Sequence, residues 1–348
     1  MRSRAVKPLH APDPEHDRQG RAAVSHMNEL DRTTPLLKRT KMFSAETWPI
    51  ACNMLPFGGT ADDGTPIREA PAHVWAGQLR QVRELGFTHV DPTDAWVPVA
   101  ELSEARLTEF KQVLADEGLA VSSISMTRRS VVDKERGDEF LALGHRLIDL
   151  APGFGATVVN TGFMQDLTAA QKRALWFWLA EGHRDDPDLR DKAISRVREL
   201  GEHAAQAGVQ ISLEMYEDTY IGTANEAAQF IRDVDHSAVG LNPDIGNLIR
   251  LHRPMPPFME MFEEVLPYSN FWHIKNYMRD EDPATGAYAS APLPLAYGLI
   301  NYRTVIHRAL ELGYVGPFVC EHYGSDSLGV CAQNAEYIRG ILRSALKS

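Results

Sequence analysis

Four apolar segments in the second half of the chain each end in a side chain that can bind a metal ion. These side chains are Glu214, Asp244, His273 and Glu321. Successive members are separated by roughly 30 residues or somewhat more, which is the length of one strand, one helix and their two loops in a (β/α)₈ barrel. The spacing therefore predicts that all four lie at the carboxyl ends of successive parallel strands, where the active sites of such barrels are built.

Two glutamates, one aspartate and one histidine offer hard oxygen ligands together with one imidazole. Such a set suits a divalent ion, with Mn²⁺ expected first and Mg²⁺ or Co²⁺ as alternatives. Three carboxylates balance a divalent charge and leave coordination positions for two oxygens of a sugar or for water. Any one of these residues alone is commonly a salt-bridge partner or a packed side chain. Four of them at the same strand end predict a single metal site.

Other polar side chains lie beside the predicted ligands. Lys275 follows His273 by two positions, so both point to the same side of an extended segment. An ammonium group there could hold a developing enolate oxygen or a substrate hydroxyl, and the alternative is a lysine on the barrel exterior. Asn242 precedes Asp244 by two positions and is expected to face inward for the same reason. Further candidates for substrate binding near the strand ends are Tyr216, Glu217 and Trp96.

The chain of 348 residues, with 44% hydrophobic and 24% charged residues, has the composition of a globular protein. Strand-like and helix-like segments alternate eight times between about residues 48 and 346, which predicts a parallel sheet. A doubly wound sheet is the rival architecture, but the early turn Phe57-Gly58-Gly59 does not fit the G-x-G-x-x-G phosphate motif. The predicted fold is α/β, a single (β/α)₈ TIM barrel over residues 45–348 preceded by a flexible N-terminal tail over residues 1–44.

The expected bounds of four segments can be compared with the structure. The third strand runs over residues 119–126, and the helix over residues 140–150 is expected to stop before Pro152, because proline disrupts a helix interior. A long helical region with one interruption is predicted over residues 168–207. An irregular loop is expected over roughly residues 275–300, as one place where substrate selection can differ from that of related barrels.

The charge and cysteine content limit the expected partners and compartment. A net charge of −11 gives no basic surface for nucleic acid, and no apolar run approaches the length of a membrane span. Three scattered cysteines are too few for a disulfide framework, so a reducing, cytoplasmic location is expected. Residues 1–44 are basic and interrupted by prolines, and they lack the apolar core of a secretory signal. This predicts a disordered tail, with Met27 or Met42 as an alternative start of translation.

The predicted ligands and the residues after His273 resemble the metal-binding positions of the sugar phosphate isomerase/epimerase family, the xylose-isomerase-like barrels. The matching positions are Glu214, Asp244, His273-Ile274-Lys275 and Glu321. The stretch Gly298–Tyr302 resembles that family's G-x-[IV]-[DN] turn, and as in the family a helix, a Gly-Tyr-Val-Gly turn and an apolar strand follow it. The resemblance covers roughly residues 48–346. It implies one divalent metal, often Mn²⁺, bound to adjacent sugar oxygens.

The resemblance also implies a reaction. In this family carboxylates move a proton on the carbon next to a carbonyl, through an enediolate or enolate intermediate. Glu214 and Glu321 would then be ligand and acid/base at once on opposite sides of the substrate, with Lys275 as a further catalytic residue. The expected activity is that of a metal-dependent sugar isomerase or epimerase acting on a small-molecule carbohydrate.

One position departs from the family pattern. Many members carry D-x-G-H after the sixth strand, whereas here Asn247 stands in place of the histidine and can hydrogen-bond a hydroxyl but cannot act as a base. The chain also resembles the catalytic α subunit of bacterial C-glycoside deglycosidases, lyases that eliminate from a 3-keto C-glycoside and bind a small β subunit. A homo-oligomer or a complex with a small second subunit is therefore expected. A non-catalytic sugar-binding barrel and an abasic-DNA endonuclease are the remaining alternatives, and the acidic charge disfavours the endonuclease.

Overall fold

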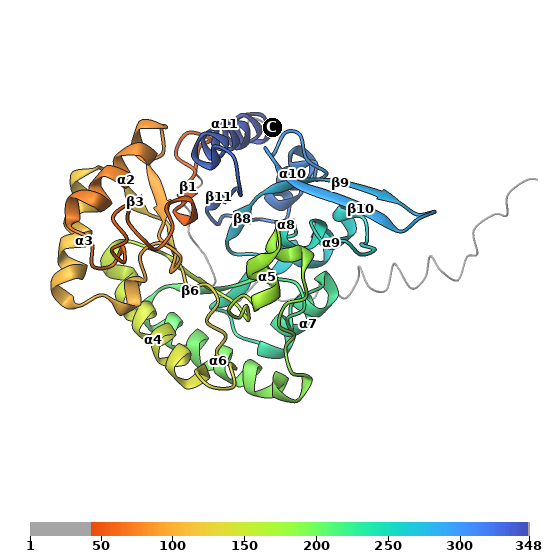
Figure 1. Ribbon diagram of the computed structural model, residues 1–348, viewed down its shortest axis with the longest axis horizontal. Coiled ribbons are helices and arrows are strands. Elements are labelled where there is room, and N and C mark those ends of the chain that lie inside the picture. Colours follow the sequence, from red (N-terminus) through yellow and green to blue (C-terminus); the bar gives the residue numbers. More distant parts are fainter. Residues whose placement is uncertain (1–42, 347–348) are drawn as a thin grey trace, which may run out of the picture. The chain divides into compact units, whose positions relative to one another are not determined.

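The computed structural model describes residues 43–346, which form a parallel β-barrel surrounded by helices, as predicted (Figure 1). Eight strand positions build the barrel, and the third position is divided into two short pieces. The strands are β1 (Ile50–Asn53), β2 (His89–Asp91), β3 (Ala120–Val121), β4 (Ser123–Ser125), β5 (Val158–Thr161), β6 (Gln210–Glu214), β7 (Val239–Asn242), β8 (Trp272–Ile274) and β11 (Phe318–Cys320).

Every neighbouring pair of barrel strands is parallel. The first strand, β1, lies between β2 and the last strand, β11. Two isolated parallel bridges, Thr93 to Ser125 and Leu241 to Ser269, join the five-stranded and four-stranded parts. Because all strands run in the same direction, their carboxyl ends meet at one mouth of the barrel, where side chains from different strands can combine into a site.

The helices cover the outside of the barrel, and the longer ones bury an apolar face against it (Figure 1). In the helix after β6, Ala227, Phe230, Ile231 and Val234 are buried at spacings of three and four residues, and Thr223 caps the first turn. The α-helices are α2 (Ala72–Glu84), α3 (Glu104–Asp116), α4 (Gly137–Phe154), α5 (Ala169–Arg173), α6 (Arg190–Ala207), α7 (Ala224–Val234), α8 (Gly246–Ile249), α9 (Phe258–Val265), α10 (Tyr302–Glu311) and α11 (Ser327–Ala345), and the 3₁₀ turns are η1 (Leu55–Phe57), η2 (Val99–Glu101), η3 (Phe177–Leu179), η4 (Pro187–Leu189) and η5 (Leu266–Tyr268).

Two predicted elements have different bounds in the structure. The third strand is broken at Ser122 into β3 and β4. The helix that was expected to stop before Pro152 continues as α4 to Phe154 and ends at Gly155, whose φ is 76°. Pro152 lies in the last turn, so its missing N–H removes a hydrogen bond at the end of the helix and not in its middle.

The prediction of a long helical region over residues 168–207 is wrong in its first half. Between residues 168 and 189 the structure has only the short helix α5 and the turns η3 and η4, and the long helix α6 begins at Arg190. The aromatic run within this segment is held by ring contacts instead. Trp176 and Trp178 stack with centroids 4.9 Å apart, and Trp178 meets the ring edge of Tyr277. Aromatic packing on the neighbouring side chains thus replaces a regular helix here.

Residues 275–300, predicted as an irregular loop, contain a two-stranded antiparallel hairpin that projects from the barrel (Figure 1). Its strands, β9 (Asn276–Asp282) and β10 (Ala287–Leu293), pair only with each other. At its base, Asn276 Nδ2 donates hydrogen bonds of 2.9 Å to the carbonyl oxygens of Leu295 and Ile300. The prediction of an irregular loop is therefore wrong, and the segment is an ordered insertion between β8 and α10.

The predicted flexible tail over residues 1–44 lies outside the described residues except for its last two. Phe43 contacts the ring of Trp48 with centroids 5.6 Å apart, and the carbonyl of Ser44 accepts a hydrogen bond from the N–H of Trp48. These two residues therefore belong to the barrel domain. No helix within residues 43–346 is both long enough and apolar enough to cross a membrane.

Candidate metal centre and substrate cavity

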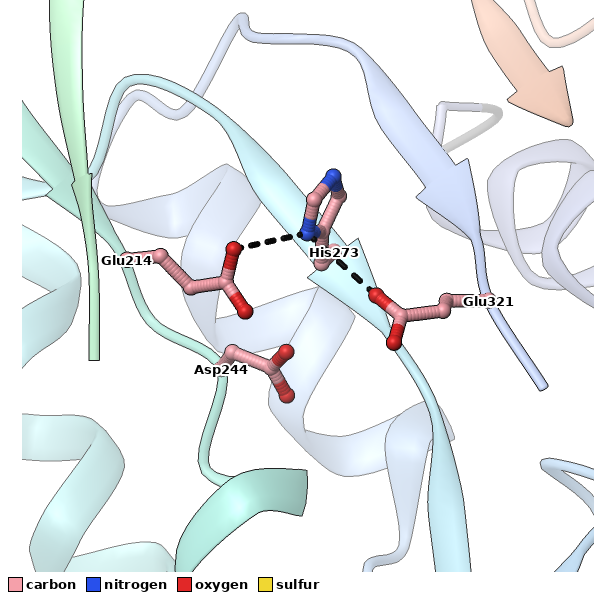
Figure 2. Close-up of side chains that lie close together, drawn as sticks. All are labelled: Glu214, Asp244, His273 and Glu321. Atoms are coloured by element: carbon pink, nitrogen blue, oxygen red, sulfur yellow. Dashed lines mark ion pairs between the residues drawn. The ribbon is translucent and has the colours of Figure 1, made fainter. Parts of the chain in front are cut away.

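The four predicted metal-binding side chains converge at the carboxyl-end mouth of the barrel. One ligand atom from each of Glu214, Asp244, His273 and Glu321 lies within 4.8 Å of the other three, and all four residues are buried. Figure 2 shows the three carboxylates and the imidazole turned toward a shared centre. The four strands thus deliver their ligands to one place, which is the geometry that a single metal ion needs.

The positions of these residues on their strands differ slightly from the predicted ones. Glu214 is the last residue of β6, and Glu321 directly follows β11. His273 is the middle residue of β8, and Asp244 lies two residues beyond the end of β7. The strand stops before Pro243, which has no N–H for the sheet. The strand end predicted at Asp244 is therefore wrong by two residues, and those predicted at His273 and Glu321 are wrong by one residue each.

Short polar contacts connect the cluster. His273 Nδ1 lies 3.2 Å from Glu214 Oε2 and 3.3 Å from Glu321 Oε2 (Figure 2). Lys275 Nζ lies 2.6 Å from Asp244 Oδ2 and 2.8 Å from Glu321 Oε1. Lys275 is 2% exposed, so its side chain lies inside the barrel and not on the exterior. The ammonium group therefore neutralises part of the carboxylate charge.

Two polar atoms in the cluster are buried without a hydrogen-bond partner, His273 Nδ1 and Asp244 Oδ1. Both are atoms that coordinate divalent metals in proteins. Four buried carboxylates, those of Glu214, Asp244, Glu321 and Asp91, also share the site with the single ammonium of Lys275, so the site has an excess of negative charge that attracts a cation. The residues present therefore fit a hard divalent ion such as Mg²⁺ or Mn²⁺, which Glu214, Asp244, His273 and Glu321 would hold.

Asp91 is a buried carboxylate at this site that the sequence patterns did not identify. Its Oδ2 lies 3.1 Å from His273 Nε2 and accepts hydrogen bonds from Ser125 Oγ (2.8 Å) and Asn53 Nδ2 (2.9 Å). When Nε2–H of the imidazole is donated to Asp91, Nδ1 keeps its lone pair for the cluster. A carboxylate in this position orients metal-binding histidines. The sequence signal that could have identified Asp91 is its place at the end of a strand-like segment over residues 88–91.

Replacing Asp91 with asparagine is expected to weaken metal binding about 10- to 100-fold, because the carboxylate that fixes the tautomer of His273 is lost. Isothermal titration with Mn²⁺ measures this change. Asp149→Asn is the matched control, since Asp149 makes a similar 2.9 Å contact with His203 on the outer helices. Equal affinities for the Asp91→Asn protein and the control would contradict the assigned role.

Hydrogen bonds and one ion pair around the cluster connect side chains from all eight strand positions. Asn160 Nδ2 donates to Glu214 Oε2 (3.1 Å) and to Ser125 Oγ (3.2 Å), and Asn160 Oδ1 accepts from Asn242 Nδ2 (3.3 Å). Asn242 Oδ1 in turn accepts the backbone N–H of His273 (2.8 Å). We call this set the polar ring; in chain order its members are Asn53, Asp91, Ser125, Asn160, Glu214, Asn242, His273 and Glu321.

The buried charges shift one another's protonation. Burial raises the pKa of Asp244 to about 7. Burial opposes the charged form of His273, but the carboxylates around it outweigh this effect and hold its pKa well above the usual value. Burial likewise opposes ionisation of Glu214, yet the charges of His273 and Lys275 lower its pKa to about 2. In the metal-free protein below pH 7, Asp244 and His273 therefore hold protons that a metal ion must displace.

Metal affinity is accordingly expected to rise with pH between about 5 and 7, by about tenfold per pH unit for each proton displaced. The direction follows because the metal binds the deprotonated forms of Asp244 and His273, which become more populated as pH increases. Titration with Mn²⁺ in buffers of different ionisation enthalpy counts the protons released. An affinity that is constant over this range would show that these two groups are already deprotonated.

Glu214, His273 and Glu321 line a cavity of about 580 Å³, a volume suited to a small molecule. Tyr216, one of the predicted substrate-binding residues, also lines it. The other lining residues are Asn53, Leu55, Thr93, Asp94, Ala95, Glu101, Thr127, Arg128, Arg129, Arg136, Phe140, Met164, Asp166, Leu167, Phe177 and Tyr323. The cavity therefore reaches from the candidate metal centre to a wall that contains three arginines.

The prediction that Trp96 offers a face to the substrate is wrong. Its side chain is fully buried, its ring meets the edge of Phe110, and its Nε1–H donates to Gln78 Oε1 at 2.7 Å. The chain after β2 thus turns this residue into the helix layer. Hydrophobic burial of the large ring outside the barrel mouth explains the difference.

The other three predicted substrate-binding residues are buried and make contacts within the chain. Asn242 belongs to the polar ring. Asn247 Nδ2 donates to Glu214 Oε1 and Asp244 Oδ2, each at 3.1 Å, so this amide positions two carboxylates. Glu217 forms a 2.9 Å ion pair with the fully buried Arg250. None of the three is on the wall of the large cavity described above.

Comparison with known proteins supports this arrangement. A family model described as the xylose isomerase-like TIM barrel matches residues 79–344. A crystal structure of a xylose isomerase-like TIM barrel protein from Mycobacterium smegmatis, in complex with magnesium, is 71% identical. It covers 88% of this chain and 100% of its own, with a TM-score of 0.86.

More distant proteins share the fold. D-allulose 3-epimerase from Methylomonas sp. is 13% identical over 84% of this chain and 98% of its own, with a TM-score of 0.59. 3-keto-D-glucoside 4-epimerase from E. coli is 14% identical over 84% and 99%, with a TM-score of 0.57. 3-Dehydroshikimate dehydratase from Bacillus anthracis is 24% identical over 132 residues, which is 35% of this chain and 46% of that relative.

Proposed function

The chain belongs to the xylose isomerase-like TIM barrel family, and on that basis we propose that it is a divalent-metal-dependent enzyme. Its reaction moves a proton on the carbon next to the carbonyl group of a sugar or keto-sugar, with isomerisation or epimerisation as the outcome. Epimerases among the proteins of similar fold support this reaction class. Mg²⁺ or Mn²⁺ is the proposed ion, and the magnesium complex of the 71% identical protein supports the former.

The observation that carries the proposal is the convergence of ligand atoms from four residues within 4.8 Å, three of which, Glu214, His273 and Glu321, line a substrate-sized cavity. A structural salt-bridge cluster would satisfy its own polar atoms. Here Asp244 Oδ1 is buried without a hydrogen-bond partner, and so is His273 Nδ1, although two carboxylates lie near this nitrogen. Leaving such atoms unpaired costs about 1–3 kcal/mol each, which favours a site built for an ion.

Two carboxylates are placed to exchange protons with a substrate carbon. Glu214 and Glu321 approach the same imidazole nitrogen of His273 from different strands, at 3.2 and 3.3 Å, and both line the cavity. The pKa of each is lowered although burial opposes this, because the charges of His273 and Lys275 favour the carboxylate, so both are ionised at neutral pH. One accepts a proton from one face of the carbon, and the other, once protonated, returns one to the opposite face.

Lys275 supplies the positive charge next to these carboxylates. Burial opposes its ionisation, but Asp244 and Glu321 hold its pKa well above the usual value, so the ammonium stays charged. Its Nζ can donate a hydrogen bond to a substrate oxygen as negative charge develops there. A bound divalent ion would add Lewis-acid stabilisation of that charge. Asn247 and Asn160 hold Glu214 in place by hydrogen bonds of 3.1 Å.

Elimination is a second candidate outcome. The dehydratase from Bacillus anthracis, similar over part of its length, supports it, and so does Asn247, which cannot act as a base. The C-glycoside deglycosidase reaction, with a small second subunit, is the form of elimination that the sequence favoured. It begins with the same proton abstraction, so one experiment addresses both outcomes.

The test is deuterium exchange in D₂O, followed by NMR, with the Mg²⁺- or Mn²⁺-loaded full-length protein. The substrate panel holds free ketoses, 3-keto glycosides, a 3-keto C-glycoside and 3-dehydroshikimate. Deuterium should enter the carbon next to the carbonyl, and EDTA should stop it. The identity of the product then distinguishes epimerisation from elimination. No exchange on any panel member, with metal demonstrably bound, would count against the proposed reaction and favour a binding role.

A further inference from the structure

Arg128 lines the substrate cavity without a carboxylate partner among residues 43–346. Its Nη1 donates to the backbone oxygen of Gln165 at 2.9 Å, and its Nη2 donates to the hydroxyl of Tyr216 at 3.2 Å. Both acceptors are neutral, and these bonds use two of the five N–H donors of the guanidinium. A full positive charge therefore faces the cavity with unused donors.

The two other arginines on the cavity wall differ in this respect. Arg129 binds Asp94 Oδ2 at 2.5 Å and also pairs with Glu101. Arg136 forms an ion pair with Glu139 at 2.6 Å. Their charges are neutralised within the chain, so neither requires an anion from outside.

The backbone at Arg128 is held in a conformation that a long side chain rarely adopts. Its φ is 53°, in the left-handed region that favours glycine and short polar residues. The other non-glycine residues with positive φ in the described chain are Asp218, Asp235 and Ser325. The guanidinium lies over the rings of Phe177 and Tyr216, 5.3 and 5.7 Å from their centroids. Strain combined with a fixed, unpaired cation is typical of a functional position.

The charges of the cavity indicate what this cation binds. Of the carboxylates on the cavity wall, Asp94 and Glu101 pair with Arg129, and Asp166 favours the charged form of Arg136. Among residues 43–346 no carboxylate is paired with Arg128. Guanidinium is the group best suited to bind a carboxylate, so an acidic group of the substrate is the partner that this position fits.

We propose that the substrate carries a carboxylate group and that Arg128 binds it, so that this residue selects acidic sugars or keto acids over neutral sugars. The inference rests on the proposed proton-transfer function and names its substrate class. A phosphate group carries nearly two charges at neutral pH and would need a second unpaired cation. The described cavity wall offers none, because Arg129 and Arg136 are already paired.

Binding can be measured without turnover. Titration calorimetry with the Mg²⁺-loaded full-length protein compares matched sets: D-glucose, D-glucuronate and D-glucose 6-phosphate, and the same three forms of galactose. Each carboxylate should bind about ten- to a hundredfold more tightly than its neutral partner, as expected for a charged hydrogen bond. If no carboxylate is preferred over its neutral sugar, or if the phosphate esters bind best, the proposal is wrong.

Substitution of Arg128 locates the effect. Arg128→Gly should abolish the preference for the carboxylate and leave neutral-sugar binding unchanged, while the melting temperature stays equal or rises because glycine relieves the strained φ. Arg136→Gln, on the same wall, is the control and should keep the preference. A lower melting temperature with equal loss for charged and neutral sugars would assign Arg128 a structural role.

These measurements separate the two proposals. Absence of deuterium exchange on every substrate would refute the proton-transfer function, whereas calorimetry alone decides on the carboxylate. Exchange on neutral sugars together with equal calorimetric affinity for acidic and neutral sugars in the wild-type protein would refute the substrate class and leave the reaction standing.

Discussion

Glu214→Gln is expected to reduce metal-dependent deuterium exchange by about 10³-fold or more, because the substitution removes a metal ligand and a proton-transfer carboxylate at once. Glutamine has nearly the same shape, and its amide oxygen can still accept one of the two hydrogen bonds that Asn160 and Asn247 donate to Glu214. The fold should therefore survive. Exchange is measured by NMR at saturating Mg²⁺, with circular dichroism and the melting temperature as checks on folding.

The matched control for this variant is Glu101→Gln, a carboxylate on the wall of the same cavity that pairs with Arg129 and Arg68. It should retain exchange, since Glu101 has no contact with the metal cluster. Glu321→Gln should behave like Glu214→Gln. Exchange at the wild-type rate in either of these two variants would remove the corresponding glutamate from the reaction.

Lys275→Met is expected to lower the free energy of unfolding of the metal-free protein by about 3 kcal/mol, because two buried carboxylates lose the ammonium that compensates them. With Mg²⁺ bound the loss should be smaller, since the ion supplies positive charge to the same groups. Chemical denaturation with and without Mg²⁺ measures the difference. Exchange activity should fall as well, because the hydrogen-bond donor to the substrate oxygen is gone.

Lys111→Met on the outer helix α3 is the control for this experiment, as Lys111 lies over the ring of Phe154 and contacts no carboxylate of the site. Its effect should be small and independent of Mg²⁺. A loss for Lys275→Met that is the same with and without Mg²⁺ would mean that Lys275 contributes packing and not charge compensation.

The barrel was predictable from the sequence because each strand and its helix leave an apolar pattern of their own. Two misjudged segments lacked such a pattern. The β9–β10 hairpin pairs only with itself and exposes both polar and apolar residues, so its strands resemble a loop. The run around Trp176 has enough apolar residues for a helix, yet its rings pack on neighbouring aromatic side chains. Long-range contacts decided both segments.

The metal ligands were recognisable because a carboxylate or histidine at a strand end is chemically distinctive and its recurrence is informative. Asp91, Ser125 and Asn160 were not, since single polar residues at strand ends are common in any barrel. Arg128 gave no signal either, because its importance comes from a backbone angle and from the carboxylates it lacks. Trp96 was misplaced because the sequence does not tell on which side of a strand end the chain turns.

The polar ring also has a meaning for how the barrel assembles. Each of the eight strand positions, or the residue directly after it, contributes a side chain that joins the polar ring by a hydrogen bond or an ion pair. A slip of a strand by one residue would turn its polar member away and, at most positions, place an apolar neighbour in the ring. Misregistered barrels would therefore leave buried polar groups unpaired, at about 1–3 kcal/mol each. The residues that hold the chemistry thus also act as a register check during folding, so that a correctly closed barrel and a complete site arise together.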